Sequence, residues 1–203
     1  MTNKRILFIG AHTDDIEYCA GGTMFKLKEN NEIHCIAFSK CSDSVPERFS
    51  KDVLKHEFES AMLFLNPKSF KLYDFQVRKF PEHRQAILEI LYKVNKELNP
   101  DVIFCVNDNH QDHKVIGEEC ERAFRRKTLI NFAIPKNGQK HNMAVSLRDS
   151  DVLNKLKLTS YYKSQEYIRG NNEDQDRIIM QYNGYISGNE NAELFHIKYL
   201  NYE

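Results

Sequence analysis

The sequence predicts a single α/β domain with a mainly parallel sheet flanked by helices, and three observations support this fold class. Short apolar runs of strand length alternate with longer segments in which apolar residues recur every three or four positions, as in amphipathic helices. This alternation is typical of βαβ units with right-handed crossovers and parallel strands. A chain of 203 residues, 41% of them hydrophobic, can bury one sizeable core. We therefore expect one domain over residues 1–203.

Four candidate strands occupy the first half of the chain, and each is a short run rich in apolar residues. They cover residues 6–11, 33–38, 70–75 and 101–106. The segments between them have helical periodicity, so we expect helices over residues 24–28, 48–65 and 86–98. The last of these should end at Asn99, because Pro100 cannot continue the hydrogen-bonded turn.

The last third of the chain is less regular. We expect a turn at residues 134–138, a strand at 143–147, a helix at 152–162, a polar surface loop at 169–176 and a closing strand at 192–197. The sequence has no internal repeat and no low-complexity tract. Nothing in it therefore indicates a second domain.

Composition limits the compartment and the class of partner. Lys plus Arg and Asp plus Glu both number 29, so the formal net charge is zero and no basic block predicts a nucleic-acid polymer as partner. Five cysteines without paired C-x-x-C spacing argue against a disulfide scaffold and favour the cytoplasm. No apolar run approaches the roughly 18 residues of a membrane span. We expect a cytoplasmic protein with a small-molecule partner, and the oligomeric state stays open, a homo-oligomer included.

A polar cluster begins directly where the first candidate strand ends. His12, Asp14 and Asp15 follow the apolar run, and Glu17 comes two residues later. In an open α/β sheet, ligands bind in the crevice outside the carboxyl ends of the strands. An imidazole and several carboxylates at this point therefore form a candidate reaction centre.

The strand at residues 101–106 ends in a second polar cluster, which includes His110, Asp112 and His113. Catalytic zinc typically takes three protein ligands and leaves a fourth position to water. His12 and Asp15 after one strand, with His113 after the other, match this requirement. We predict a Zn²⁺ site with these ligands, and another divalent metal, such as iron, could occupy it.

The remaining side chains of the two clusters suit the other roles in metal-assisted hydrolysis. Bound metal can lower the pKa of water to about 7, and a neighbouring carboxylate must then accept the proton. Asp14 is the candidate general base, because it precedes a ligand. His110, as imidazolium, could donate to an oxyanion or a leaving group. Asp112 could orient a ligating histidine through an outer hydrogen bond.

Each of these residues also has a purely structural interpretation. Asp, Asn and Thr are favoured as caps and turn formers where a strand is followed by a helix. That interpretation is the better one for any single residue, whereas two clusters at two strand ends, both with imidazoles, favour a site. Gly21-Gly22 lacks the G-x-G-x-x-G spacing of dinucleotide sites, so we expect it to serve close packing of a helix on a strand.

The two clusters and their spacing resemble the motifs of a known family. Residues 11–17 and 21–23, followed by 110–113, are similar to the motifs of the PIG-L/LmbE-like zinc-dependent deacetylases of N-acetylated sugars. Residues 100–102, 162–165 and 192–195 resemble later landmarks of that family, so the resemblance extends over nearly the whole chain. It implies a Rossmann-like sheet and the same zinc ligands, base and electrostatic partner as those assigned above.

The resemblance implies an activity and a class of substrate. The expected reaction is hydrolysis of the carbon–nitrogen bond of a linear amide, which removes an N-acetyl group from an amino sugar or its conjugate. The chain departs from the family pattern at Thr13, where proline is usual, and at Leu54, which replaces a substrate-contacting arginine. Arg48 and Arg78 are the candidates for the missing substrate-binding cation, although both also fit ordinary surface positions.

Two other functions are compatible with the same residues. A metal-dependent phosphoesterase is one, because Asp-rich strand ends also suit Mg²⁺, although three imidazoles favour zinc. A sugar-binding domain without catalysis is the other. Such a domain would be expected to lack a ligand or the base, and none is missing from this sequence.

Overall fold

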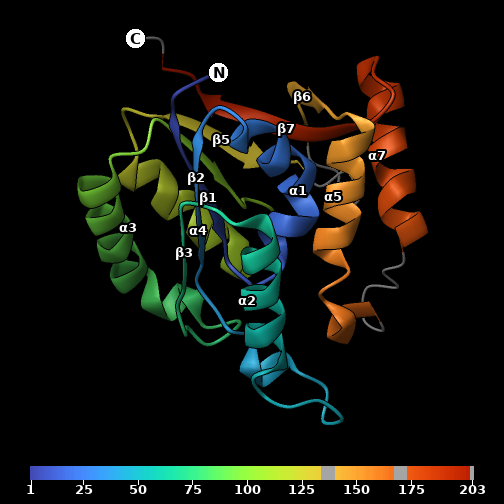
Figure 1. Cartoon of the computed structure of the whole chain (residues 1–203). Coiled ribbons are helices and arrows are strands. Elements are labelled where there is room, and N and C mark those ends of the chain that lie inside the picture. The colour runs from blue at the N-terminus through green and yellow to red at the C-terminus, as the bar shows by residue number, and fades with distance from the viewer. Residues whose placement is uncertain (134–139, 167–172, 202–203) are drawn as a thin grey trace.

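The computed structural model describes residues 1–133, 140–166 and 173–201 of the chain, which form one seven-stranded sheet with helices on both faces (Figure 1). The strand order is β3-β2-β1-β4-β5-β7-β6. The strands are β1 (Arg5–Gly10), β2 (Glu32–Ala37), β3 (Ser69–Leu72), β4 (Val102–Cys105), β5 (Thr128–Phe132), β6 (Met143–Ser146) and β7 (Ala192–Tyr199). Strands β1 to β5 pair in parallel, whereas β7 runs antiparallel to its neighbours β5 and β6. The predicted mainly parallel α/β fold is confirmed.

The helices form two layers around this sheet. They are α1 (Asp15–Lys28), α2 (Val53–Leu65), α3 (Arg84–Leu98), α4 (Gln111–Ala123), α5 (Asp149–Thr159) and α7 (Glu173–Ser187). Figure 1 shows α3 and α4 on one side of the sheet, with α1, α2 and α5 on the other and α7 outermost. None of the described helices has both the length and the apolar character that crossing a membrane requires.

Several predicted boundaries were wrong, and two elements of the structure were not predicted. Helix α1 already begins at Asp15, inside the first polar cluster, and neither α4 nor β5 was predicted. The loop predicted at residues 169–176 is wrong for 173–176, which form the first turn of α7. Acidic side chains are favoured in a first helical turn because they complement the helix dipole, so the polar composition there was misleading. Residues 169–172 and the turn predicted at 134–138 lie outside the described residues.

The central strands are buried on both faces, which explains their continuous apolar sequences. Phe8 of β1 stacks on Phe104 of β4 with ring centroids 4.7 Å apart, and Phe104 in turn contacts Phe195 of β7 edge-on. Ile9 is paired with Cys105 at the carboxyl ends of the adjacent strands β1 and β4. The segments that follow these two strands therefore leave the sheet side by side.

Helix α1 is interrupted at Ala20, where the backbone is not helical. The amide groups of Gly22 and Thr23, which begin the second part of the helix, donate to the Glu193 carboxylate of β7 at 3.1 and 2.7 Å. Lys155 of α5 lies 2.6 Å from the same carboxylate and also donates to a carbonyl of the first helical part. This buried network fixes the direction of α1, whose first turn carries part of the polar cluster.

Gly21 and Gly22 make the close packing that we predicted, but against other partners. A Cβ atom on Gly21 would lie 3.1 Å from Lys155, and one on Gly22 would lie 2.7 Å from Leu147. The two glycines therefore let α1 approach α5 and the segment that precedes it, and not a strand.

We predict that Glu193→Ala lowers the free energy of unfolding by about 3–5 kcal/mol, because it leaves the Lys155 ammonium buried without its carboxylate. Urea unfolding followed by circular dichroism measures this loss. The double variant Lys155→Met/Glu193→Ala should be more stable than the single variant, since no unpaired charge stays buried. Glu190→Ala, at an exposed position, is the control and should change stability by less than about 0.5 kcal/mol. A loss for Glu193→Ala as small as that of the control would contradict the role of this network.

Candidate metal centre

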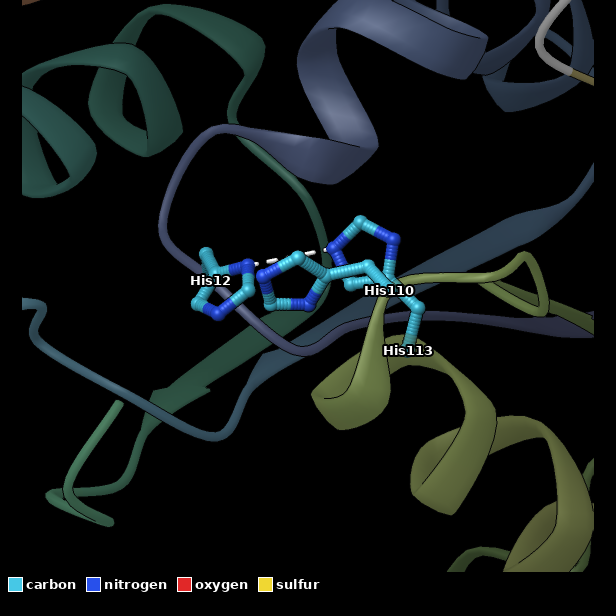
Figure 2. A group of neighbouring side chains, drawn as sticks. All are labelled: His12, His110 and His113. Atoms are coloured by element: carbon cyan, nitrogen blue, oxygen red, sulfur yellow. Dashed lines mark hydrogen bonds between the residues drawn. The ribbon is translucent and has the colours of Figure 1, made fainter. Parts of the chain in front are cut away.

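Two chain segments bring the predicted site residues together at the carboxyl edge of the sheet. His12, Asp14 and Asp15 lie between β1 and the first turn of α1, and His110 to His113 lie at the start of α4, shortly after β4. Figure 2 shows the imidazole rings of His12, His110 and His113 facing one another from these two segments. The edge at which they meet is the one where open α/β sheets bind ligands.

The three side chains predicted as metal ligands have donor atoms at nearly equal spacing. His12 Nδ1 lies 3.1 Å from His113 Nε2 and 3.4 Å from Asp15 Oδ2, and His113 Nε2 lies 3.3 Å from Asp15 Oδ1. Bonds of about 2.0–2.2 Å to a tetrahedral zinc ion place ligand atoms about 3.3 Å from one another. Asp15 offers a different oxygen to each imidazole, so the three side chains have the chemistry and the approximate spacing of a divalent-metal site.

A second donor set shares two of these residues. One nitrogen each of His12, His110 and His113 lies within 4.8 Å of the others. The two sets differ in their third member, which is Asp15 or His110. Asp15 is buried, and its Oδ2 accepts the amide protons of Ala11 and His12 at 3.0 and 2.8 Å. His110 is exposed, and its Nδ1 accepts the amide proton of Asp112 as the N-cap of α4.

The imidazoles of His12 and His113, which we call the inner imidazoles, each contact a carboxylate. The contact uses the ring nitrogen that points away from the other inner imidazole. His12 Nε2 lies 3.2 Å from Asp112 Oδ2, and His113 Nδ1 lies 3.0 Å from Asp108 Oδ2. Such contacts fix the ring orientation and leave the other nitrogen for a metal. Asp112, predicted to orient a histidine, lies against His12. Asp108 was not predicted to act, although its place three residues after β4 and five residues before His113 was a usable signal.

The charge of the carboxylates governs the titration of the two inner imidazoles. Burial lowers the pKa of His12, but Asp15 and Asp112 outweigh it and raise the value to about 9. Burial likewise lowers the pKa of His113, whereas Asp15 and Asp108 raise it to about 10. The carboxylates thus favour positive charge between the rings, where a divalent cation would replace the protons.

The other predicted residues lie around this group. Asp14 is buried, and its negative charge helps to raise the pKa of Glu57, after the larger effect of burial. Arg78 is an exposed residue, and its backbone amide group donates a hydrogen bond to Asp112 Oδ2 at 2.7 Å. Arg48 is also exposed, and its guanidinium lies over the Phe49 ring.

A hydrogen-bonded group beneath the cluster supports the turn that carries it. The Tyr162 hydroxyl lies 2.5 Å from the Thr13 carbonyl oxygen and 2.7 Å from Glu17 Oε1. The hydroxyl is placed to donate to both oxygens, so it connects the turn at Thr13 to the first turn of α1. Burial raises the pKa of Glu17 to about 8, although the hydrogen bond from Tyr162 acts in the opposite direction. Tyr162 was noted in the sequence only as a family landmark, because nothing local indicates which turn it reaches.

Comparison with solved structures identifies the fold. N,N'-diacetylchitobiose deacetylase from Pyrococcus horikoshii has a TM-score of 0.80 at 21% identity, covering 96% of this chain and 83% of its own. The zinc-inhibited form of teicoplanin deacetylase Orf2 gives 0.74 at 11%, covering 94% and 96%. GalB, a 4-carboxy-2-hydroxymuconate hydratase from Pseudomonas putida KT2440, gives 0.79 at 14%, covering 98% of both chains. At these identities the similarity concerns the fold alone.

Sequence comparison identifies the family. A search of curated proteins finds no match. The family model described as PIG-L, GlcNAc-PI de-N-acetylase, matches residues 7–124, which include both polar clusters and more than half of the chain. The resemblance seen in the motifs is therefore confirmed, and the chain belongs to the PIG-L family.

Proposed function

We propose that this protein is a zinc-dependent amidohydrolase that removes the N-acetyl group from an amino sugar or an amino-sugar conjugate. The observation that carries the proposal is that His12 Nδ1 and His113 Nε2 lie 3.1 Å apart, each within 3.4 Å of an oxygen of the Asp15 carboxylate. Membership of a family described by de-N-acetylation supports the reaction type. A deacetylase of an acetylated sugar among proteins of the same fold supports the substrate class.

In this proposal Asp15, and not His110, is the third metal ligand. Two amide protons hold the Asp15 carboxylate beside both inner imidazoles, whereas His110 is exposed and uses Nδ1 to cap α4. A zinc ion held by His12, Asp15 and His113 would supply Lewis acidity toward a carbonyl oxygen and acidify a water molecule. Another divalent ion could supply the same chemistry.

The protein's own groups move the protons. We assign the general base to Asp14, whose carboxylate accepts a proton from the attacking water and returns it to the departing amine nitrogen. His110 donates a hydrogen bond to the oxyanion of the tetrahedral intermediate. Because its Nδ1 accepts the Asp112 amide proton, His110 acts as a neutral imidazole with its proton on Nε2, and not as the imidazolium that we first expected.

Arg78 is the better of the two candidates for substrate contact. Its amide group donates to Asp112, the carboxylate that contacts the ligand His12, so its exposed side chain starts close to the proposed centre. Arg48 stays the second candidate, from the loop before α2.

We predict that Asp14→Asn lowers turnover by about 10²–10⁴-fold without loss of zinc, because it removes the base and keeps every ligand. A mass-spectrometric screen of N-acetylated sugars and sugar nucleotides for acetyl loss identifies the substrate, and elemental analysis measures the metal. Asp149→Asn, on the exposed start of α5, is the matched control and should keep full activity. Loss of zinc from Asp14→Asn would make Asp14 a ligand, and full activity of metal-stripped protein would reject the proposal.

A comparison of two variants tests the choice of the third ligand. Asp15→Asn should weaken zinc binding by more than roughly 100-fold, because it removes a ligand oxygen, whereas His110→Ala should weaken it by less than roughly tenfold. Competition with a chromophoric chelator measures both affinities. The opposite order would assign the site to the three histidines.

The outer carboxylates give a further prediction. Asp108→Asn should weaken zinc binding by roughly 10–100-fold, because His113 loses the partner that fixes its ring. The same chelator competition measures this change, with Asp43→Asn, at an exposed position of the short 3-10 helix after β2, as control. Unchanged affinity would show that Asp108 has no part in orienting His113.

A further inference from the structure

Helix α7 packs on the rest of the protein through a face that is mostly polar or small. Its buried residues are Asp176, Met180, Asn183 and Gly184. Gly184 allows the helix to lie close to the chain before β7, because a Cβ atom there would lie 2.3 Å from the Glu190 carbonyl oxygen. Asp176 accepts a hydrogen bond from Thr159 of α5 at 2.8 Å. This helix therefore buries little apolar side chain against its own domain.

Apart from Met180, the large apolar side chains of α7 lie on its outward face instead. Five of them are exposed: Ile178 by 62%, Ile179 by 47%, Tyr182 by 56%, Tyr185 by 84% and Ile186 by 38%. At 100° per residue these positions fall within an arc of about 120°, so they form one continuous strip, which we call the outer stripe. An arc of this width is typical of the face that a helix packs against a core. In α7 that face is turned toward solvent, on the outermost helix of the molecule (Figure 1).

The composition of the outer stripe is that of an interface. The nine residues from Ile178 to Ile186 include no charged side chain. Tyrosine is enriched at the centres of protein interfaces, where charged residues are depleted. The five residues expose roughly 600 Å² together, the tyrosine hydroxyl groups included, which is comparable to the largest apolar patch of a monomer. Each partner in a standard-size complex buries about 800 Å², so the stripe by itself has the size of a small interface.

We infer that the outer stripe is a contact surface between two copies of this chain. A two-fold contact places the same surface on both sides, so a charged helix face would repel its copy. The stripe has no charge, and the formal net charge of the chain is zero, so neither short-range nor long-range repulsion opposes this contact. The tyrosines can pack their rings against isoleucine across the axis while each hydroxyl group stays at the rim.

Sedimentation equilibrium of the full-length protein from about 1 to 100 μM tests this inference, and it needs no substrate. The wild type should associate. Tyr182→Glu should raise the dissociation constant by roughly tenfold or more, because each copy then presents a carboxylate at the middle of the stripe. Tyr182→Phe should associate like the wild type. Leu63→Glu, on α2 and 73% exposed, is the matched control for adding a charge at an exposed apolar site.

Thermal unfolding of each variant distinguishes loss of association from loss of fold. An assembly larger than a dimer that becomes smaller in Tyr182→Glu would also support the stripe as a contact between copies. A wild type that stays monomeric over the whole range would overturn the inference, as would an assembly that Tyr182→Glu leaves unchanged. Monomers that bind neutral phospholipid vesicles through Tyr182 would assign the stripe to a lipid surface and would likewise overturn it.

Discussion

The parallel pairing of β1 with β4 is the constraint on which the candidate centre depends. The two strands are far apart in sequence, but Ile9 and Cys105 lie opposite each other at the end of the pairing. The residues that follow are therefore delivered to one edge of the sheet from both strands. The segment after β1 supplies His12 and Asp15, and the segment after β4 supplies His113, so neither segment has a complete ligand set by itself.

The carboxylates around the donor atoms attract positive charge and are also held in place by hydrogen bonds. Two imidazoles lie among three carboxylates, and each carboxylate also has a structural contact. Asp15 accepts amide protons from its own turn, Asp112 accepts one from Arg78, and Asp108 accepts one from His110 at 2.7 Å. A centre held in this way loses little side-chain freedom when a cation binds, which lowers the entropic cost of binding. The fold itself does not decide the reaction, since a hydratase shares it with deacetylases.

Much of the fold and of the centre could be predicted because the signals are local. Apolar runs marked β1 and β4, and the polar residues directly after them marked the centre. Helix α4 was missed because its first turn coincides with the second polar cluster and charged residues dilute its apolar periodicity. Long-range contacts left no local signal. Examples are the contact of Glu193 with the break of α1 and the contact of Tyr162 with Thr13. The residues around a glutamate or a tyrosine do not show which distant backbone group it contacts.

The hydrogen bonds that frame α1 have a consequence for the order of synthesis. Glu193 accepts a hydrogen bond from the amide group of Gly22, which lies 171 residues earlier in the chain. Tyr162 donates one to the carbonyl oxygen of Thr13, which lies 149 residues earlier. All the candidate ligands leave the ribosome long before these partners do. The nascent chain therefore exposes its imidazoles and carboxylates before the frame that orients them can exist. Closing such long loops is entropically costly and slow, so the centre should become ordered only at the end of folding, after β7 has joined the sheet.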